Sequence, residues 1–268
     1  MYDFVSESFN RTNSYKNKLS IQVSLNGFSF CIQNEEENRI LLFKRADFVI
    51  SGEHLLARRF RDWYNEEELL RLPFKKREVV LNSPHFSLVP HQLESISLKK
   101  TISDLLPGDK DAEYAEGWIK TIQAKLIYHL PSEWAKTTNE TLGDSRLVHP
   151  VQKLIGYQKR STEADLLLLY FDEKEMYLVL KKGDELVLTN FFRINHVNDA
   201  LYFVLTALQQ FDLVSKRMTV QTCGKASYLD ELVSLFRKYF NRTEILLPTF
   251  LEKCELSNEI LNQHLCLF

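Results

Sequence analysis

Alternating hydrophobic and polar positions near the start of the chain predict a β-hairpin. Apolar residues fill every second position of residues 19–25, and the alternation resumes in residues 28–32 after the pair Asn26-Gly27. An Asn-Gly pair is typical of a type I′ turn, because both central residues of that turn need a positive φ. The elements predicted after the hairpin are a third strand at 40–43, a helix at 53–64 and a fourth strand at 78–81.

The second half of the chain repeats this order. Its strongest signal is the stretch 197–211, where apolar residues recur at the i, i+3, i+4, i+7 spacing of an amphipathic helix. The resulting order, βββαβαβ, indicates a mixed β-sheet with helices on its faces. The other elements predicted in this half are strands at 166–171, 176–180, 185–189, 218–222 and 244–247, and a helix that Ser227 caps and that carries apolar residues as far as Phe240.

Between the halves, the pattern predicts a strand at 124–129 and helices at 132–142 and 151–157. We therefore divide the chain near residue 160. The first predicted domain comprises residues 1–160, including a polar segment at its start, and the second comprises residues 161–268.

Composition narrows the class of protein. The chain has 268 residues, of which 44% are hydrophobic and 26% are charged, as in a globular protein of one or two domains. A net charge of −2 lacks the positive field of a nucleic-acid binder or a polybasic membrane anchor. The longest fully apolar run, residues 166–171, is far shorter than the ~20 residues of a membrane helix. We expect a cytoplasmic protein without a membrane span.

Cysteine and histidine spacing gives no metal pattern. Cys31, Cys223, Cys254 and Cys266 are far apart, so we expect reduced and mostly buried thiols. Cys223 has two interpretations, a nucleophile at the start of a helix or an inert buried thiol. The second is favoured because no histidine lies near it in the sequence. No metal site is predicted.

Two successive modules of this kind resemble the actin-like superfamily, whose domains share a ribonuclease H-like core and hold nucleotide in the cleft between them. Residues 19–30, 86–90 and 126–131 look like a family of uncharacterised bacterial proteins with a domain of unknown function, and the likeness spans nearly the whole chain. That family is assigned the actin-like ATPase fold, and in outline it is similar to actin-like subunits of type IV pilus and type II secretion platforms. The resemblance implies an α/β protein of two tandem ribonuclease H-like domains.

The resemblance also implies where a nucleotide would bind. The first phosphate loop would contain Asn26, Gly27 and Ser29, and the second would begin at Asp172. Asn26 has no carboxylate with which to bind Mg²⁺ or activate water. The residues after Asp172 are Glu173, Lys174 and Glu175 instead of glycines, and both glutamates would repel a phosphate.

The adenosine motif would lie between a strand and the following helix, where the chain has Gly224 and Lys225 in place of a glycine pair. Each of these motifs also has a purely structural interpretation. Asn26-Gly27 is then a hairpin turn, Asp172 a solvated hairpin tip, and Gly224 a requirement of strand-to-helix geometry.

Basic residues concentrate in one stretch of the first half. They are Arg58, Arg59, Arg61, Lys75, Lys76 and Arg77. A solvated face balanced by the acidic run 66–68 is favoured over a patch that binds RNA or a phosphorylated partner. A nuclease is disfavoured, because two-metal chemistry needs several carboxylates and the strand 19–25 has none.

These patterns favour a non-catalytic interaction or assembly module that binds a protein partner through its cleft or an exposed sheet edge. No cofactor is expected in that case. The alternative is an ATP-dependent switch with weak or no hydrolysis, in which Gly27 and Ser29 cradle phosphate, Asp172 holds Mg²⁺ through water and Gly224 leaves room for adenosine. A third hypothesis is an RNA-associated protein that uses the basic stretch.

Overall fold

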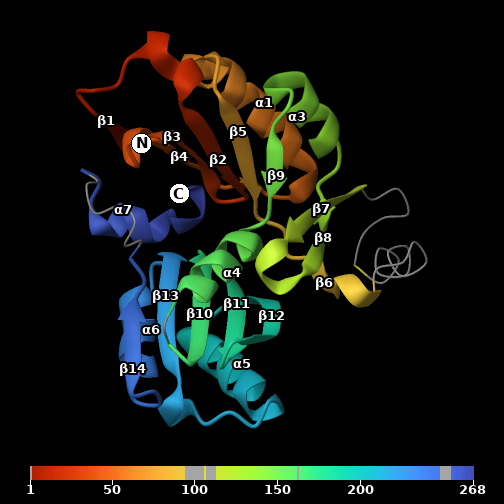
Figure 1. Cartoon of the computed structure of the whole chain (residues 1–268), viewed down its shortest axis with the longest axis vertical. Coiled ribbons are helices and arrows are strands. Elements are labelled where there is room, and N and C mark those ends of the chain that lie inside the picture. Colours follow the sequence, from red (N-terminus) through yellow and green to blue (C-terminus); the bar gives the residue numbers. More distant parts are fainter. Residues whose placement is uncertain (1, 94–105, 107–112, 162, 248–254) are drawn as a thin grey trace. The chain divides into compact units, whose positions relative to one another are not determined.

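The computed structural model describes residues 2–93, 106, 113–161, 163–247 and 255–268. The chain divides into two compact units (Figure 1). Unit 1 comprises Met1–Pro150, Thr249–Ser257 and Cys266–Phe268, and unit 2 comprises Val151–Pro248 and Asn258–Leu265. The boundary between the two units thus lies at the start of helix α4 (Pro150–Arg160), whereas the predicted boundary at residue 160 lies at the end of that helix.

Unit 1 contains a six-stranded sheet with the order β1-β4-β3-β2-β5-β9. Neighbouring strands are antiparallel from β1 to β2, whereas β5 runs parallel to β2 and β9 runs parallel to β5. The predicted meander and the strand at 78–81 are confirmed, while β1 and β9 lacked a sequence signal. The strands are β1 (Tyr2–Val5), β2 (Lys18–Ser24), β3 (Gly27–Asn34), β4 (Arg39–Asp47), β5 (Lys76–Leu81) and β9 (Arg146–Val148).

The turn between β2 and β3 differs by one residue from the prediction. Ser24 pairs with Gly27, so Leu25 and Asn26 are the two central residues of the turn, not Asn26 and Gly27. Gly27 has a φ of 136°, and a Cβ atom at this position would lie 2.5 Å from the carbonyl oxygen of Ala46 in β4. Glycine is therefore needed here for the close approach of a neighbouring strand.

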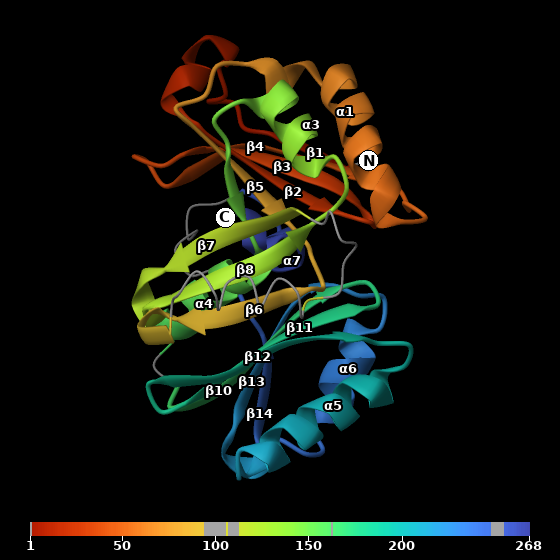
Figure 2. The same ribbon diagram turned by 90° about the vertical axis from the view of Figure 1, so that its right-hand side faces the viewer.

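Aromatic packing joins helices α1 (Leu56–Glu66) and α3 (Trp134–Leu142) to the sheet of unit 1. The Phe60 ring centroid lies 5.7 Å from that of Phe28 in β3 and 5.1 Å from that of Trp134. Figure 2 shows the two helices side by side, in agreement with their mutual contacts. Both helices were predicted, although the first turn before α1 is a 3₁₀ helix, Glu53–Leu55.

A second, three-stranded antiparallel sheet in unit 1 has the order β6-β8-β7. Only β8 (Ala124–Leu130) had a sequence signal, whereas β6 (Phe86–Pro90) and β7 (Glu113–Ile119) did not. His149 is completely buried beside this sheet, with its ring centroid 4.8 Å from that of Phe86 and 5.1 Å from that of Tyr128.

Unit 2 contains a five-stranded sheet with the order β12-β11-β10-β13-β14. This matches the order β4-β3-β2-β5-β9 of unit 1, so the internal repeat predicted from the element order is confirmed. Helices α5 (Val197–Gln210) and α6 (Leu229–Phe236) contact each other (Figure 2), and their apolar faces pack into the same buried cluster as β10, β11 and β13. The strands are β10 (Asp165–Asp172), β11 (Glu175–Lys182), β12 (Glu185–Arg193), β13 (Thr219–Lys225) and β14 (Arg242–Ile245).

Two details of unit 2 correct the prediction. β13 extends to Lys225, so Gly224 and Lys225 lie in the strand and not in the loop after it. Tyr228, not Ser227, is the N-cap residue of α6. A short helix near the end of the chain, α7 (Asn258–Gln263), also had no sequence signal.

The described residues also bear on the predictions about membrane helices, cysteines and basic residues. None of the helices in the described part of the chain is long and apolar enough to cross a membrane. Cys31, Cys223 and Cys266 are buried as expected and are not joined to one another by a disulfide, whereas Cys254 lies outside the described residues. Three cations of the basic stretch form ion pairs, Arg61 with Glu140 at 3.3 Å, Lys75 with Glu36 and Lys76 with Glu35. These carboxylates lie outside the predicted acidic run 66–68, in which Glu67 pairs with Lys44 and Glu68 with Arg11.

Candidate functional site

The structure brings the first group of predicted nucleotide-loop residues together in the β2–β3 hairpin. Asn26 lies in the turn, Gly27 begins β3, and Ser29 follows within β3 with only 3% of its surface exposed. The Asn26 amide donates a hydrogen bond to Ser24 Oγ at 3.1 Å, and Ser24 Oγ donates to the carbonyl oxygen of Gly27 at 3.4 Å. Polar groups of this turn are therefore already bonded to one another.

The second group lies in unit 2, where β10 pairs in parallel with β13. Phe171 is opposite Gly224 and Asp172 is opposite Lys225, so three of the predicted residues meet across these two strands. Asp172 is 6% exposed. The interpretation of Asp172 as a solvated hairpin tip is therefore wrong, because the tip consists of Glu173 and Lys174.

Glu173 closes this hairpin tip against the end of β13. Its φ of 54° is left-handed, and its amide donates to the carbonyl oxygen of Lys225 at 2.6 Å. Its own carbonyl oxygen accepts a hydrogen bond of 2.6 Å from the Tyr228 hydroxyl. Its carboxylate also pairs with the Lys225 ammonium at 3.2 Å. The amide, the carbonyl and the side chain of Glu173 are therefore all bonded within the protein.

The Tyr228 hydroxyl remains a hydrogen-bond donor across the physiological pH range. Burial is the main cause that raises its pKa to about 12, and the negative charges of Glu173 and Asp199 act in the same direction. The phenol is consequently protonated at neutral pH and can donate to Glu173 continuously.

Gly224 is required by the packing of two strands. Its φ is 98°, and a Cβ atom here would lie 2.0 Å from the carbonyl oxygen and 2.6 Å from the amide nitrogen of Phe171. No side chain can be accommodated at these distances without separating β10 from β13. The close approach of β10 therefore explains why glycine occupies this position, without any ligand.

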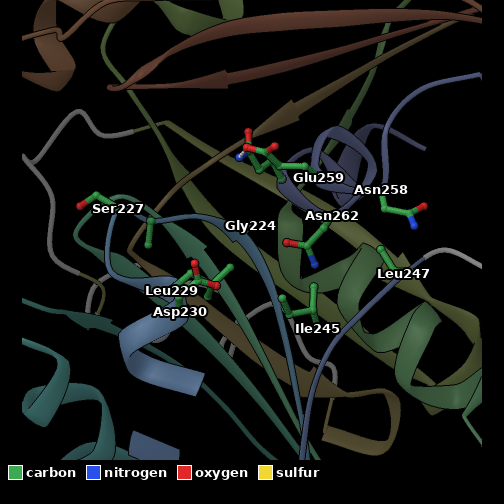
Figure 3. Close-up of a pocket in the computed structure, with 11 residues that line it drawn as sticks. Gly224, Ser227, Leu229, Asp230, Ile245, Leu247, Asn258, Glu259 and Asn262 are labelled. Carbon is green, nitrogen blue, oxygen red and sulfur yellow. Dashed lines mark hydrogen bonds between the residues drawn. The ribbon is translucent and has the colours of Figure 1, made fainter. Parts of the chain in front are cut away.

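A pocket of about 420 Å³ lies beside Gly224, between the β13–α6 connection, the end of β14 and helix α7 (Figure 3). Its wall combines apolar side chains, amides and the carboxylates of Asp230 and Glu259. None of the described lining residues has a basic side chain. The lining residues are Gly224, Ala226, Ser227, Leu229, Asp230, Ile245, Leu247, Asn258, Glu259, Asn262 and Gln263.

Asn262 anchors the α7 wall of this pocket. Its side-chain amide nitrogen donates to the carbonyl oxygens of Thr222 in β13, at 3.1 Å, and of Leu246 after β14, at 2.7 Å. The side chain is 3% exposed. Sequence reasoning identified Gly224 and its surroundings but missed this helix, because a six-residue element has too few positions to show a period.

The described residues contain no cluster of metal-binding side chains. Across residues 2–93, 106, 113–161, 163–247 and 255–268, no group of three or more His, Cys, Asp and Glu residues could hold a metal ion.

Comparisons with solved structures identify the fold. A Bacteroides thetaiotaomicron protein with an actin-like ATPase fold and unknown function superimposes with a TM-score of 0.80 at 18% identity, covering 89% of this chain and 93% of that one. The PilM-PilN type IV pilus biogenesis complex contains a chain with a TM-score of 0.53 at 14% identity, covering 93% and 96%. The chain thus has the actin-like ATPase fold, with two ribonuclease H-like sheets.

No match is found among curated proteins. Residues 6–242 match a family described as "Protein of unknown function (DUF3822)". The predicted resemblance to uncharacterised proteins with this fold is confirmed, and so is the distant similarity to a pilus protein. Because the match extends over most of the sequence, the chain belongs to the DUF3822 family.

Proposed function

We propose that this protein is a non-catalytic interaction module that binds a protein partner, and that its nucleotide loops no longer serve ATP. The observation that carries this proposal is the closure of the β10–β11 hairpin by Glu173. If this chain bound nucleotide as the actin-like superfamily does, this hairpin would present free backbone N–H groups to a phosphate. Here the Glu173 amide donates a hydrogen bond to the carbonyl oxygen of Lys225, and the Glu173 carboxylate forms an ion pair with the Lys225 ammonium.

Binding a phosphate at this hairpin would be unfavourable for two reasons. The Glu173 amide would have to leave the Lys225 carbonyl, which would lose a net stabilisation of about 0.5–1.5 kcal/mol for one hydrogen bond. The phosphate would also meet the carboxylates of Glu173 in the turn and Glu175 at its end, which outnumber the Lys174 ammonium between them, and like charges repel. The Lys225 ammonium, which could offset this repulsion, is already paired with Glu173.

The first hairpin supports the same proposal. Asn26 supplies no carboxylate for Mg²⁺, and its amide is bonded to Ser24. The conformation of Gly27 is accounted for by the approach of Ala46. Neither glycine of the predicted loops, Gly27 or Gly224, needs a ligand to explain its presence.

Two observations support a protein as the partner. One chain of the PilM-PilN complex has a fold similar to that of this protein, and the complex is an assembly of two proteins. Strand β12 is an edge of the unit 2 sheet, nine residues long, with half-buried apolar side chains at Leu186, Val187 and Leu188. Edge strands of this kind can pair with an added strand from another chain.

Calorimetric titration of the nucleotide-stripped protein with Mg-ATP and Mg-ADP tests the proposal. We expect no binding heat up to millimolar nucleotide and no phosphate release above the buffer background. A thermal unfolding curve on the same sample shows that the protein is folded. Micromolar binding would contradict the proposal, and a loss of that binding in Lys225→Gln would place the nucleotide at the β13 end.

The alternative, an ATP-dependent switch, is favoured by one specific observation. The 420 Å³ pocket adjoins Gly224, where the resemblance would place adenosine. The switch predicts that Mg-ATP raises the melting temperature with increasing nucleotide concentration, because a ligand bound only by the native state stabilises it by mass action. In that case Gly27 and Ser29 would hold phosphate and Asp172 would hold Mg²⁺ through water. The protein would then act as a weak ATPase or as a binder without hydrolysis.

A further inference from the structure

We infer that the pocket beside α7 binds an arginine side chain presented by the protein partner, an inference that rests on the proposed interaction function. The pocket lies entirely in unit 2, between the start of α6, the end of β14 and α7. Its chemistry differs from that of a phosphate site. Its charge and its apolar wall favour an arginine side chain, and its pre-formed shape lowers the cost of binding one.

The first property is charge. Asp230 and Glu259 place two carboxylates on the wall, one on α6 and one on α7 (Figure 3). Neither carboxylate has an ion-pair partner among the residues that the structure describes, and Glu259 accepts one hydrogen bond, from Gln263 at 3.0 Å. The helix dipole offsets part of each charge, because Asp230 and Glu259 lie in the first turns of α6 and α7. Two carboxylates without an ion pair in the described part of the chain still attract a cation and repel a phosphate.

The second property is an exposed apolar wall. Ile245 and Leu247 are 43% and 39% exposed, although both are large aliphatic residues, and Leu229 lies on the wall as well. An arginine side chain has an aliphatic stem that packs against such a surface while its charged end reaches polar groups. Its planar guanidinium can also donate several hydrogen bonds at once to carboxylate and amide oxygens, which a lysine ammonium does less well.

The third property is a pre-formed shape. Asn262 is bonded to Thr222 and Leu246, so the α7 wall is tied to the strand ends before any ligand arrives. A volume of about 420 Å³ falls in the range of roughly 300–1,000 Å³ that is typical of ligand pockets. The pocket can therefore accept a side chain without the cost of ordering its own wall.

The test is a titration of the full chain with the peptide acetyl-Leu-Arg-Leu-amide, followed by NMR or calorimetry. The reference peptide replaces arginine by citrulline, which has nearly the same shape but no charge. We expect the arginine peptide to bind at least tenfold more tightly than the citrulline peptide. We also expect its affinity to fall as salt concentration rises, because exposed charges are screened.

Variants place the binding in this pocket. The double variant Asp230→Asn/Glu259→Gln is expected to weaken binding of the arginine peptide at least tenfold. The matched control is Glu231→Gln, which removes a carboxylate from the same first turn of α6 but does not line the pocket. We expect the control to bind like the unaltered protein. All three replaced carboxylates are on exposed residues, so the fold should be retained.

Three outcomes would overturn the inference. They are equal binding of the citrulline peptide, equal weakening in Glu231→Gln, and no binding of the arginine peptide at millimolar concentration. If the peptide fails to bind and Mg-ATP also gives no heat, the pocket inference fails while the proposed interaction function stands. If Mg-ATP binds and displaces the arginine peptide, the proposed function fails instead, and the pocket belongs to a nucleotide.

Discussion

Replacing Gly224 by alanine is expected to unfold unit 2 or to prevent its folding. The new Cβ atom would lie 2.0 Å from the carbonyl oxygen and 2.6 Å from the amide nitrogen of Phe171, both of them backbone atoms that a rotamer change cannot move. Relief of this overlap requires β13 to separate from β10, which occupies the centre of the sheet. The resulting loss of several kcal/mol is comparable with the roughly 5–15 kcal/mol that stabilises a whole domain.

Gly183 provides the matched control in the same unit. It also has a left-handed φ, of 59°, but among the described residues nothing lies within 4 Å of a Cβ atom at this position. Gly183→Ala should therefore cost only the backbone preference, about 1–2 kcal/mol. Urea unfolding followed by circular dichroism compares the two variants. Similar unfolding midpoints for Gly224→Ala and Gly183→Ala would show that the strands can adapt to the Cβ atom.

The tight packing around Gly224 also limits which variants can test nucleotide binding. A variant such as Gly224→Arg would lose any bound ligand because the sheet is disrupted, whether or not the ligand touches Gly224. Lys225→Gln is more informative, because Lys225 is partly exposed at the end of the strand.

Acidification is expected to destabilise unit 1 through His149. Burial lowers the pKa of this histidine from its ordinary 6.5 to about 4, although a hydrogen bond between Nε2 and the carbonyl oxygen of Ser83, at 2.8 Å, acts in the opposite direction. The unfolded chain therefore binds a proton between about pH 6.5 and 4, whereas the folded protein does not. Stability contributed by neutral His149 is present above this window and falls as the pH falls through it. The full loss is on the order of 3 kcal/mol.

His149→Gln isolates this contribution. A glutamine amide can still donate to the Ser83 carbonyl, but it does not titrate. The free energy of unfolding, measured in urea between pH 7.5 and 4.5, should fall more steeply for the unaltered protein than for the variant. His54→Gln, at an exposed histidine, serves as the control and should keep the steep dependence. Parallel curves for the unaltered protein and His149→Gln would contradict the assignment.

Local patterns predicted the repeated order of strands and helices because they depend on short-range periodicity. The alternation in β2 and the helical spacing in α5 each fall within a single element. The elements that were missed are short or have no clear alternation. They are β1, β6, β7, β9 and α7.

The candidate site was predictable only in part. Gly27 and Gly224 were identified as special, yet their reasons lie in Ala46 and Phe171, which belong to other strands. The acidic character of the Asp172 hairpin was also visible in the sequence. The pocket was not, because its walls come from α6, β14 and α7, and α7 gave no signal.

Periodicity in the sequence was sufficient to predict an α/β protein with two similar mixed sheets, because it indicates which face of each strand or helix is buried, and two such modules in succession build the repeated sheets. The hydrogen bonds that close the predicted phosphate loops depend instead on contacts between distant segments of the chain. The hydrogen bond from Tyr228 to Glu173 joins residues 55 positions apart in the chain. Such a contact depends on how β10 and β13 pair and on where α6 begins, and no local pattern encodes that distance.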